Sequence, residues 1–268
     1  MKNQRTLWIM LGYVLVFLLA AGKDLAVSEY LTAHGWQALI AAGKHAGPLP
    51  LFLIPAFCFL SLSRVRHRLL YRVIAAVLST AAGVQLIGIT TLNLPELIAA
   101  GLSGLLFWIL LDREAERYPI ETENGKKTAK AGIIMGIASF LIIQVLKIIW
   151  GRPRFISLSD PSVSFVPWYR PGGFSFTNDL FKSFPSGHTG AAAMIFWITL
   201  LPYADRKLQP GRLWILAVLY TFLVALSRIM AGMHYLSDVM AGCAVTLSIC
   251  QILRYRYFIQ PGKEMLHE

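Results

Sequence analysis

The sequence predicts an all-α protein, a polytopic bundle of transmembrane helices. Of its 268 residues, 56% are hydrophobic and 15% are charged, and the mean hydropathy is +0.58. A soluble domain carries about 25% charged residues. The apolar residues gather in long runs, and about 20 apolar residues are enough for one helix to cross a bilayer. We therefore expect residues 1–268 to form a single integral membrane domain.

Eight apolar segments are the candidate spanning helices. They lie near residues 7–23, 48–63, 72–91, 94–111, 130–150, 188–203, 212–230 and 236–254. A short polar break near 91–95 separates the third segment from the fourth, so these are either two spans with a tight turn or one broken span. Segment 24–47 mixes charged with apolar residues, and we expect it to form an exposed, partly amphipathic helix outside the core.

The basic residues indicate how the helices are oriented. The net charge of +11 would suggest a nucleic-acid partner in a soluble protein. Here many basic residues gather in short loops, as the positive-inside rule describes, so we expect no nucleic-acid partner. Eight spans place the basic clusters at 64–72, 206–212 and 254–263 on the side of the N-terminus, which is then cytoplasmic, and the loop 151–187 on the outer side. Seven spans would divide these clusters between the two faces.

Lys147 and Arg154 form the first of three polar clusters. Lys147 lies in the last turn of an apolar helix that Gly151 and Pro153 end. Taken alone, these side chains are better explained as long basic groups that extend to the membrane interface. The other interpretation is an anion site, because a guanidinium matches a pair of phosphate oxygens and a lysine adds a point charge.

The second cluster is Pro185-Ser186-Gly187-His188, directly before an apolar run. Pro185 ends the preceding loop, and Ser186 and Gly187 are expected to leave backbone N–H groups free where the helix begins. These groups and the positive end of the helix dipole favour phosphate binding. A single histidine at a helix start is, by itself, more often an interfacial hydrogen-bonding residue than a catalyst.

The third cluster contains Ser227-Arg228, His234 and Asp238. His234 and Asp238 are four residues apart and therefore share one face of a helix. The carboxylate can accept the imidazole N–H, fix its tautomer and raise its nucleophilicity. Charged groups this close to spanning helices are costly and favour a function, and a purely structural His–Asp pair is the alternative.

The predicted topology brings the three clusters, all within 130–254, to one membrane face. Segments five and seven end on the outer side, and segments six and eight begin there. Two histidines, an aspartate and several cations, with no evident set of metal ligands, favour phosphoryl transfer through a histidine, in which the cations neutralise the phosphoryl oxygens. Arg152, Arg170 and Lys182 of the outer loop are either headgroup contacts or residues with structural or solvated roles.

These residues resemble the three-part signature of the type 2 phosphatidic acid phosphatase superfamily. The first part is a lysine, six residues and then Arg-Pro; Lys147 and Arg154 have that spacing. The second part is Pro-Ser-Gly-His, and the third is Ser-Arg followed by a spaced histidine and aspartate; both match in full. Phe155 departs from the pattern, because the family usually has proline there, and this leaves the presentation of Arg154 open.

The resemblance implies a helical fold with a six-span core, to which this chain would add two spans. It implies that His234 attacks phosphorus to form a phosphohistidine, that Asp238 orients His234, and that His188 is the general acid. The groups implied to hold the phosphoryl oxygens are the side chains of Lys147, Arg154 and Arg228 and the backbone at Ser186 and Gly187. Neither a metal nor another cofactor would be needed.

We therefore expect a membrane lipid phosphate phosphatase whose site faces outward from the cytoplasmic membrane of the cell. The candidate substrates are phosphatidic acid, phosphatidylglycerol phosphate, undecaprenyl diphosphate and the lipid A phosphates. A lipid phosphotransferase with the same site is one alternative, and a non-enzymatic transporter of anionic lipids is another. A transporter would not need a histidine paired with an aspartate, which argues against it. The sequence does not indicate whether the protein is a monomer or an oligomer.

Overall fold

The computed structural model describes residues 17, 18, 22–66, 68–89, 91 and 93–260, and this part of the chain contains helices and no strand. The long helices are α4 (Leu49–Arg66), α5 (Leu69–Ile87), α6 (Leu94–Arg117), α7 (Glu123–Trp150), α10 (Pro210–Met230) and α11 (Leu236–Arg254). The short ones are α2 (Asp24–Ala33), α3 (Gln37–His45), η1 (Phe155–Ser159), η2 (Asp179–Phe181), α8 (Gly187–Ala192), η3 (Ala193–Leu200), α9 (Leu201–Ala204) and η4 (Tyr255–Ile259). The predicted all-α fold is confirmed.

Six helices among the described residues are long and apolar enough to cross a membrane, and the protein is a multi-pass membrane protein. The predicted segment 188–203 is also helical: α8, η3 and α9 follow one another without a break. From the rise of α and 3-10 turns, this helix is roughly 30 Å long, which equals the thickness of the hydrocarbon core. The predicted first span, 7–23, lies almost entirely outside the described residues.

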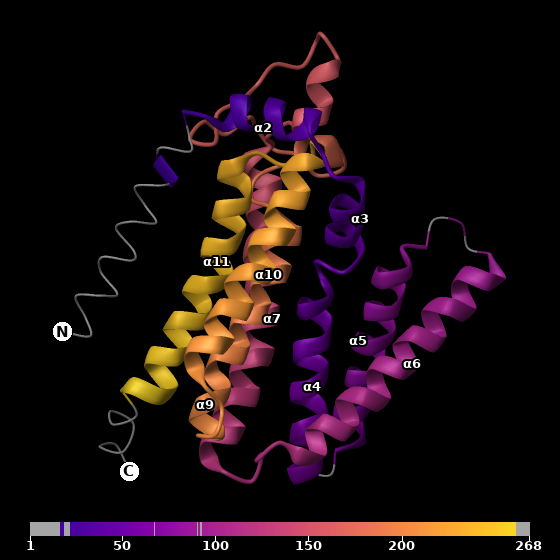
Figure 1. Cartoon of the computed structure of the whole chain (residues 1–268), viewed down its shortest axis with the longest axis vertical. Coiled ribbons are helices and arrows are strands. Elements are labelled where there is room, and N and C mark those ends of the chain that lie inside the picture. The colour runs from indigo at the N-terminus through magenta and orange to yellow at the C-terminus, as the bar shows by residue number, and fades with distance from the viewer. Residues whose placement is uncertain (1–16, 19–21, 67, 90, 92, 261–268) are drawn as a thin grey trace.

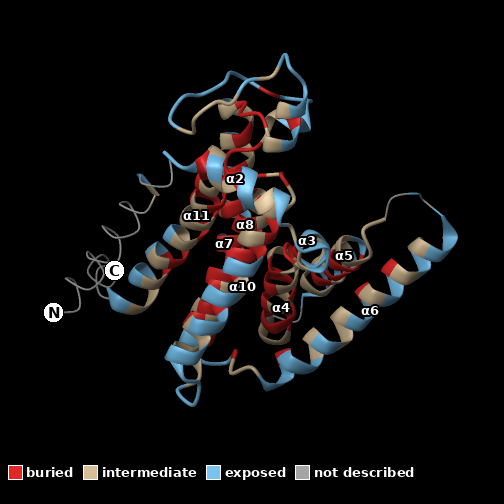
Figure 2. Ribbon diagram, turned by 45° about the horizontal axis from the view of Figure 1, so that its top comes forward, coloured by how far each residue is buried: buried red, intermediate tan, exposed pale blue. Residues whose placement is uncertain are grey.

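The polar break near 91–95 separates two helices, so α5 and α6 are distinct. Asn93 is the N-cap of α6, and its side chain accepts a hydrogen bond from the N–H of Glu96 at 2.9 Å. The two helices pack closely at Gly83. A Cβ there would lie 2.2 Å from the carbonyl oxygen of Ala100, so the lack of a side chain at this position permits the close approach. Figure 1 shows this pair at one edge of the bundle, and Figure 2 shows that most of α6 is exposed or half-buried. In a membrane, such an apolar face contacts lipid.

The core lies where α7 meets α4 and η3. A Cβ on Gly132 would lie 2.5 Å from Cys58 Sγ and 2.8 Å from Trp197 Nε1, so only glycine allows these helices to approach so closely. The indole N–H of Trp197 donates to the carbonyl oxygen of Thr128 at 2.8 Å, which satisfies the one polar atom of that side chain. The buried residues gather here and along α8, α10 and α11 (Figure 2).

Four helix ends meet at one end of the bundle. Helix α7 ends at Gly151, whose φ of +49° favours glycine, and α8 begins at the N-cap Ser186. Helix α10 ends and α11 begins beside them, and Asp238 stabilises the start of α11 by accepting the N–H of Tyr235 at 2.9 Å. The loop 151–186 and α2 lie over this end (Figure 1). The opposite end carries an ion pair between Arg64 and Asp112 at 2.9 Å.

Segment 24–47 differs from its prediction as one exposed helix outside the core. It forms two helices, α2 and α3, and both contribute buried residues: Asp24 and Ser28 from α2, and Gly43 from α3. A Cβ on Gly43 would lie 1.8 Å from Ser227 Oγ, so α3 packs tightly against α10. Glu29 and Lys44 are exposed, as expected, but the segment is two helices instead of one, and Asp24 is buried because it pairs with Arg152 at 2.9 Å.

Candidate active site

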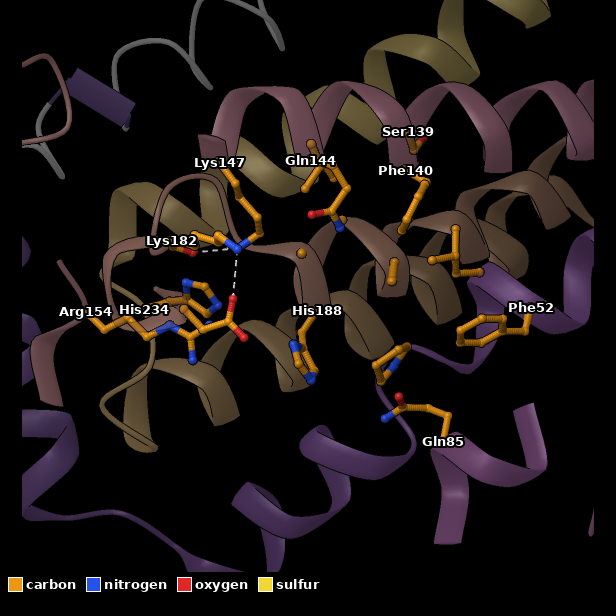
Figure 3. Close-up of a pocket in the computed structure, with 17 residues that line it drawn as sticks. Phe52, Gln85, Ser139, Phe140, Gln144, Lys147, Arg154, Lys182, His188 and His234 are labelled. Atoms are coloured by element: carbon orange, nitrogen blue, oxygen red, sulfur yellow. Dashed lines mark hydrogen bonds and ion pairs between the residues drawn. The ribbon is translucent and has the colours of Figure 1, made fainter. Parts of the chain in front are cut away.

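A cavity of about 290 Å³ opens at the end of the bundle where the four helix ends meet (Figure 3). Titratable side chains from several elements line one part of it: Lys147, Arg154, Asp179, Lys182, His188 and His234. Mainly apolar side chains of α4, α7 and α8 line the other part, including Leu51, Phe52, Phe140, Ile143 and Ala191. The sequence prediction that Lys147, Arg154, His188 and His234 come together therefore agrees with this arrangement.

His234 is held in one tautomer by the backbone. Its Nδ1 lies 2.8 Å from the carbonyl oxygen of Ser183. A carbonyl can only accept, so Nδ1 of the neutral ring carries the hydrogen and Nε2 carries the lone pair. The side chain is only 2% exposed, and burial lowers the pKa of His234 from 6.5 to about 4. A ring with that pKa is neutral at pH 7, and its lone pair lies on Nε2.

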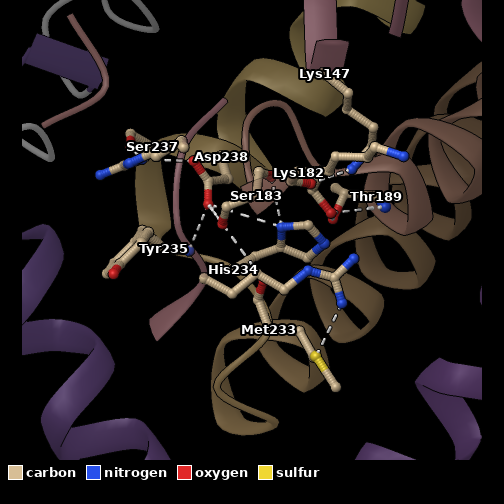
Figure 4. Close-up of polar contacts among 12 residues, drawn as sticks. Lys147, Lys182, Ser183, Thr189, Met233, His234, Tyr235, Ser237 and Asp238 are labelled. Atoms are coloured by element: carbon tan, nitrogen blue, oxygen red, sulfur yellow. Dashed lines mark hydrogen bonds and ion pairs between the residues drawn. The ribbon is translucent and has the colours of Figure 1, made fainter. Parts of the chain in front are cut away.

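Asp238 does not hold His234 by a direct hydrogen bond. Its Oδ2 lies 3.7 Å from Nδ1 of His234, beyond hydrogen-bond distance. The same oxygen accepts the hydroxyl of Ser183 at 2.5 Å and the N–H of Tyr235 at 2.9 Å (Figure 4). Ser183 thus bonds to both members of the predicted pair, through its carbonyl oxygen to His234 and through its hydroxyl to Asp238. The predicted orientation of His234 by Asp238 is indirect in this structure.

Arg152 is the counter-ion of Asp238. Its guanidinium is fully buried and donates to Asp238 Oδ1 at 2.5 Å and to Asp24 Oδ2 at 2.9 Å. The Nε of Arg152 donates to the carbonyl oxygen of Val166 at 2.7 Å, and the guanidinium lies over the ring of Tyr235 at 4.2 Å from its centroid. Of the two interpretations of Arg152, headgroup contact or structural residue, the structure supports the second.

The cations that line the cavity are only partly satisfied by the protein. Lys147 is 8% exposed and donates to the carbonyl oxygen of Lys182 at 2.6 Å. Arg154 donates through NH1 to Met233 Sδ at 3.2 Å, and its Nε is buried without a hydrogen-bond partner among the described residues. A buried guanidinium N–H without an acceptor fits a site that binds an anion.

The backbone at Arg154 is fixed although Phe155 stands where the family usually has proline. The N–H of Arg154 donates to the carbonyl oxygen of Leu180 at 2.8 Å, and its own carbonyl accepts the hydroxyl of Ser157 at 2.6 Å. Phe155 packs edge to face on Tyr235, with the ring centroids 6.2 Å apart. Hydrogen bonds and aromatic packing therefore restrain this segment without a second proline.

Two predicted phosphate contacts are occupied by protein partners. Arg228 is 3% exposed, donates to the carbonyl oxygen of Ile40 at 2.6 Å, and does not line the cavity. The N–H of Ser186 donates to the carbonyl oxygen of Asp238 at 2.9 Å, so it is not the free N–H that the sequence led us to expect. Gly187 does line the cavity, and a Cβ there would lie 3.3 Å from Lys147 Cε.

Three residues of this site were missed by sequence reasoning: Asp24, Ser183 and Ser237. Ser237 donates its N–H to Asp24 Oδ1 at 2.8 Å and its hydroxyl to Asp24 Oδ2 at 2.5 Å. Asp24 follows the predicted first span, so the predicted topology puts it on the outer side together with the arginines of the loop 151–187, but nothing in the sequence pairs it with one of them. No sequence pattern distinguishes Ser183, because its bond to His234 uses a backbone carbonyl.

No group of three or more His, Cys, Asp or Glu side chains that could hold a metal ion occurs within the described ranges. In comparisons with known proteins, the family model described as the PAP2 superfamily matches residues 127–260, half of the chain. This range includes all three polar clusters that were identified from the sequence. Neither a curated protein nor a solved structure matches the chain.

Proposed function

The chain belongs to the PAP2 superfamily, a family of phosphatases, and we propose that it hydrolyses a membrane lipid phosphate through a phosphohistidine at His234. The observation that carries this proposal is the Nδ1 contact of His234 with the Ser183 carbonyl at 2.8 Å. Because that contact leaves the lone pair on Nε2, and because His234 lines the cavity, the ring can attack phosphorus without first losing a proton.

The proposed reaction has two steps. In the first, a bond forms between Nε2 of His234 and phosphorus, the bond from phosphorus to the lipid oxygen breaks, and His188 gives a proton to the leaving alkoxide. In the second, water attacks phosphorus, His188 takes its proton, and the bond between nitrogen and phosphorus breaks. His188 suits both steps because it is half-buried and lines the same cavity.

The cations of the cavity would stabilise the transferred group. Lys147 and Arg154 line the same cavity as His234. An ammonium has three donors, and Lys147 has one hydrogen-bond partner within the described part of the chain. Charge-assisted bonds to the phosphoryl oxygens strengthen as charge develops in the transition state. Arg228 does not line the cavity and would stabilise the phosphoryl charge from outside it. The backbone of Gly187, which lines the cavity at the start of α8, would also stabilise that charge.

The shape of the cavity favours a lipid over a soluble phosphate ester. The cationic part and the apolar part belong to one space, and the apolar part lies along α4 and α7, both long enough to span the bilayer. A substrate with a phosphate group and a hydrocarbon chain matches both parts. We place the site at the outer face of the cytoplasmic membrane, because basic residues such as Arg64 and Arg254 lie at the opposite end of the bundle.

The test is release of inorganic phosphate from a panel of lipid phosphates and diphosphates by the purified full chain in EDTA. His234→Ala should reduce release by roughly 10³-fold or more. His34→Ala is the matched control, because His34 is exposed and, among the described residues, its ring is hydrogen-bonded to the carbonyl oxygen of Tyr30, at 2.8 Å. Labelled substrate should leave an acid-labile, alkali-stable phosphoryl group on the control and none on His234→Ala.

Each other outcome has a definite meaning. Unchanged release by His234→Ala would overturn the assignment of the nucleophile. Transfer of the labelled phosphoryl group to a second lipid instead of to water would identify a phosphotransferase with the same site. If neither the wild type nor any variant releases phosphate from any substrate, the proposal of an enzyme would be overturned and a transporter of anionic lipids would be favoured.

A further inference from the structure

A buried cluster of charges lies behind the site, on the side away from the cavity. It contains the carboxylates of Asp24 and Asp238 and the guanidinium of Arg152 between them, and all three side chains are 0% exposed. Ser237 closes the cluster, since its hydroxyl contacts both Arg152 NH1 at 2.8 Å and Asp24 Oδ2 at 2.5 Å. With both carboxylates ionised, the cluster carries one net negative charge next to His234.

We propose that Asp24 and Arg152 are positioning residues for the reaction at His234: they share one positive charge with Asp238 and thereby set the net charge beside the nucleophile. Asp24 lies on α2 and accepts a hydrogen bond from the N–H of Ser237, which is 213 positions away in the sequence. Neither Asp24 nor Arg152 lines the cavity, so neither contacts the substrate. Both act through Asp238, whose Oδ2 is 3.7 Å from Nδ1 of His234. This inference rests on the proposed function.

The physical reason lies in the charge that the ring acquires. When Nε2 bonds to phosphorus while Nδ1 keeps its hydrogen, the imidazole becomes positively charged. A net negative charge behind the ring stabilises that state, but too much negative charge would protonate the free ring and remove the nucleophile. Arg152 cancels one of the two carboxylate charges and so keeps the balance between these two effects.

The other charged groups around His234 come from each element packed near it. They are Lys147 of α7, Arg154 of the outer loop, Asp179 and Lys182 around η2, His188 of α8, Arg228 of α10 and Asp238 of α11. None of them is changed in the experiment below. Their contributions to the ionisation of His234 are therefore common to every variant.

The experiment compares wild type with Asp24→Asn, Arg152→Met and the double variant, on one lipid phosphate, over a range of pH. Asp24→Asn makes the cluster neutral, so the acid limb of kcat/KM should move to lower pH while kcat at pH 7 falls about tenfold and KM stays unchanged. Arg152→Met leaves two negative charges, so the acid limb should move by about one pH unit to higher pH. The double variant restores one net negative charge, and its acid limb should return toward that of wild type.

A merely structural role would change the amount of folded enzyme and leave the acid limb in place. Ser28→Ala is the matched control, because Ser28 is buried on the same helix as Asp24 and its hydroxyl has no partner in the described part of the chain. If Arg152→Met does not fold, the shift in Asp24→Asn decides. An unmoved limb in Asp24→Asn would overturn the inference while leaving the proposed function intact. Inactive wild type would overturn the proposed function itself.

Discussion

Replacing Arg152 with Met tests how the fold tolerates two carboxylates in its interior. The guanidinium contacts Asp238 at 2.5 Å and Asp24 at 2.9 Å, and water reaches none of the three side chains. Removing one partner of a buried ion pair costs about 3–5 kcal/mol, because the remaining charge is left without compensation. Here two carboxylates lose their counter-ion together. We therefore expect the free energy of unfolding to fall by about 5 kcal/mol.

A second substitution shows whether charge is the cause. In the wild-type background, Asp24→Asn weakens bonds to Arg152 and Ser237, and we expect it to cost about 1–3 kcal/mol. In the Arg152→Met background, the same change removes one of two uncompensated charges, so it should stabilise the protein. Residues in contact show coupling energies of about 0.5–3 kcal/mol. Because the effect of Asp24→Asn should change sign between the two backgrounds, we expect the coupling energy of Asp24 and Arg152 to lie at the upper end of that range.

The assay is thermal unfolding of the purified protein in one detergent at pH 7, followed by the fluorescence of its 7 tryptophans. Chains of this length lose about 2–4 °C in Tm for each kcal/mol, so Arg152→Met should melt roughly 10–20 °C below wild type. Ser28→Ala controls for a small change in α2. Equal losses of Tm on Asp24→Asn in both backgrounds would refute the argument, because the effect would then not depend on the charge of Arg152.

Three further predictions concern the nucleophile, the packing of α3 and the orientation in the membrane. Burial lowers the pKa of His234 to about 4, and the attacking ring must be unprotonated, so the acid limb of the pH profile of kcat/KM should lie near pH 4. An acid limb near pH 6.5 that disappears when His234 is replaced would contradict this. Gly43→Ala should lower the free energy of unfolding by about 1–3 kcal/mol, since its Cβ would lie 1.8 Å from Ser227 Oγ, whereas Gly101→Ala, with open space around it, should be neutral or stabilising. In intact cells, a membrane-impermeant maleimide should label Ser162→Cys but not Lys207→Cys, both exposed positions at opposite ends of the bundle; the reverse pattern would invert the proposed orientation.

Hydropathy was sufficient to find the long helices of the described part of the chain, for a physical reason. A segment that crosses a bilayer must satisfy its backbone hydrogen bonds internally and needs an apolar run of a set length, so the sequence carries both the position and the number of residues of each span. Span parity then brings the ends of α7 and α10 and the starts of α8 and α11 to one end, and for that reason Lys147, His188 and His234 could be expected to meet.

The supporting contacts could not be predicted in the same way. Ser183 contacts His234 through a carbonyl oxygen, an atom that every residue possesses. Arg152 and Asp24 are separated by 128 positions, and no periodicity links them. Arg152 and Arg154 flank Pro153 symmetrically, so composition gives no reason for one to be buried between carboxylates while the other lines the cavity. These assignments depend on tertiary packing.

The occupancy of Asp238 explains why His234 bonds to a neutral carbonyl instead of a carboxylate. Asp238 already accepts from Arg152, from the hydroxyl of Ser183 and from the N–H of Tyr235, three of the roughly four acceptor positions that a carboxylate offers. A carbonyl fixes the tautomer of the imidazole but stabilises its protonated form less than a carboxylate at hydrogen-bond distance would. This arrangement favours a neutral free ring, and in the proposed reaction the net negative cluster would be close enough to stabilise the charge that the ring acquires on phosphorylation. In the proposed reaction, different groups would control tautomer and charge: the Ser183 carbonyl the first, and the cluster of Asp24, Arg152 and Asp238 the second. A substitution in that cluster should therefore shift the pH dependence without changing which nitrogen is free to attack.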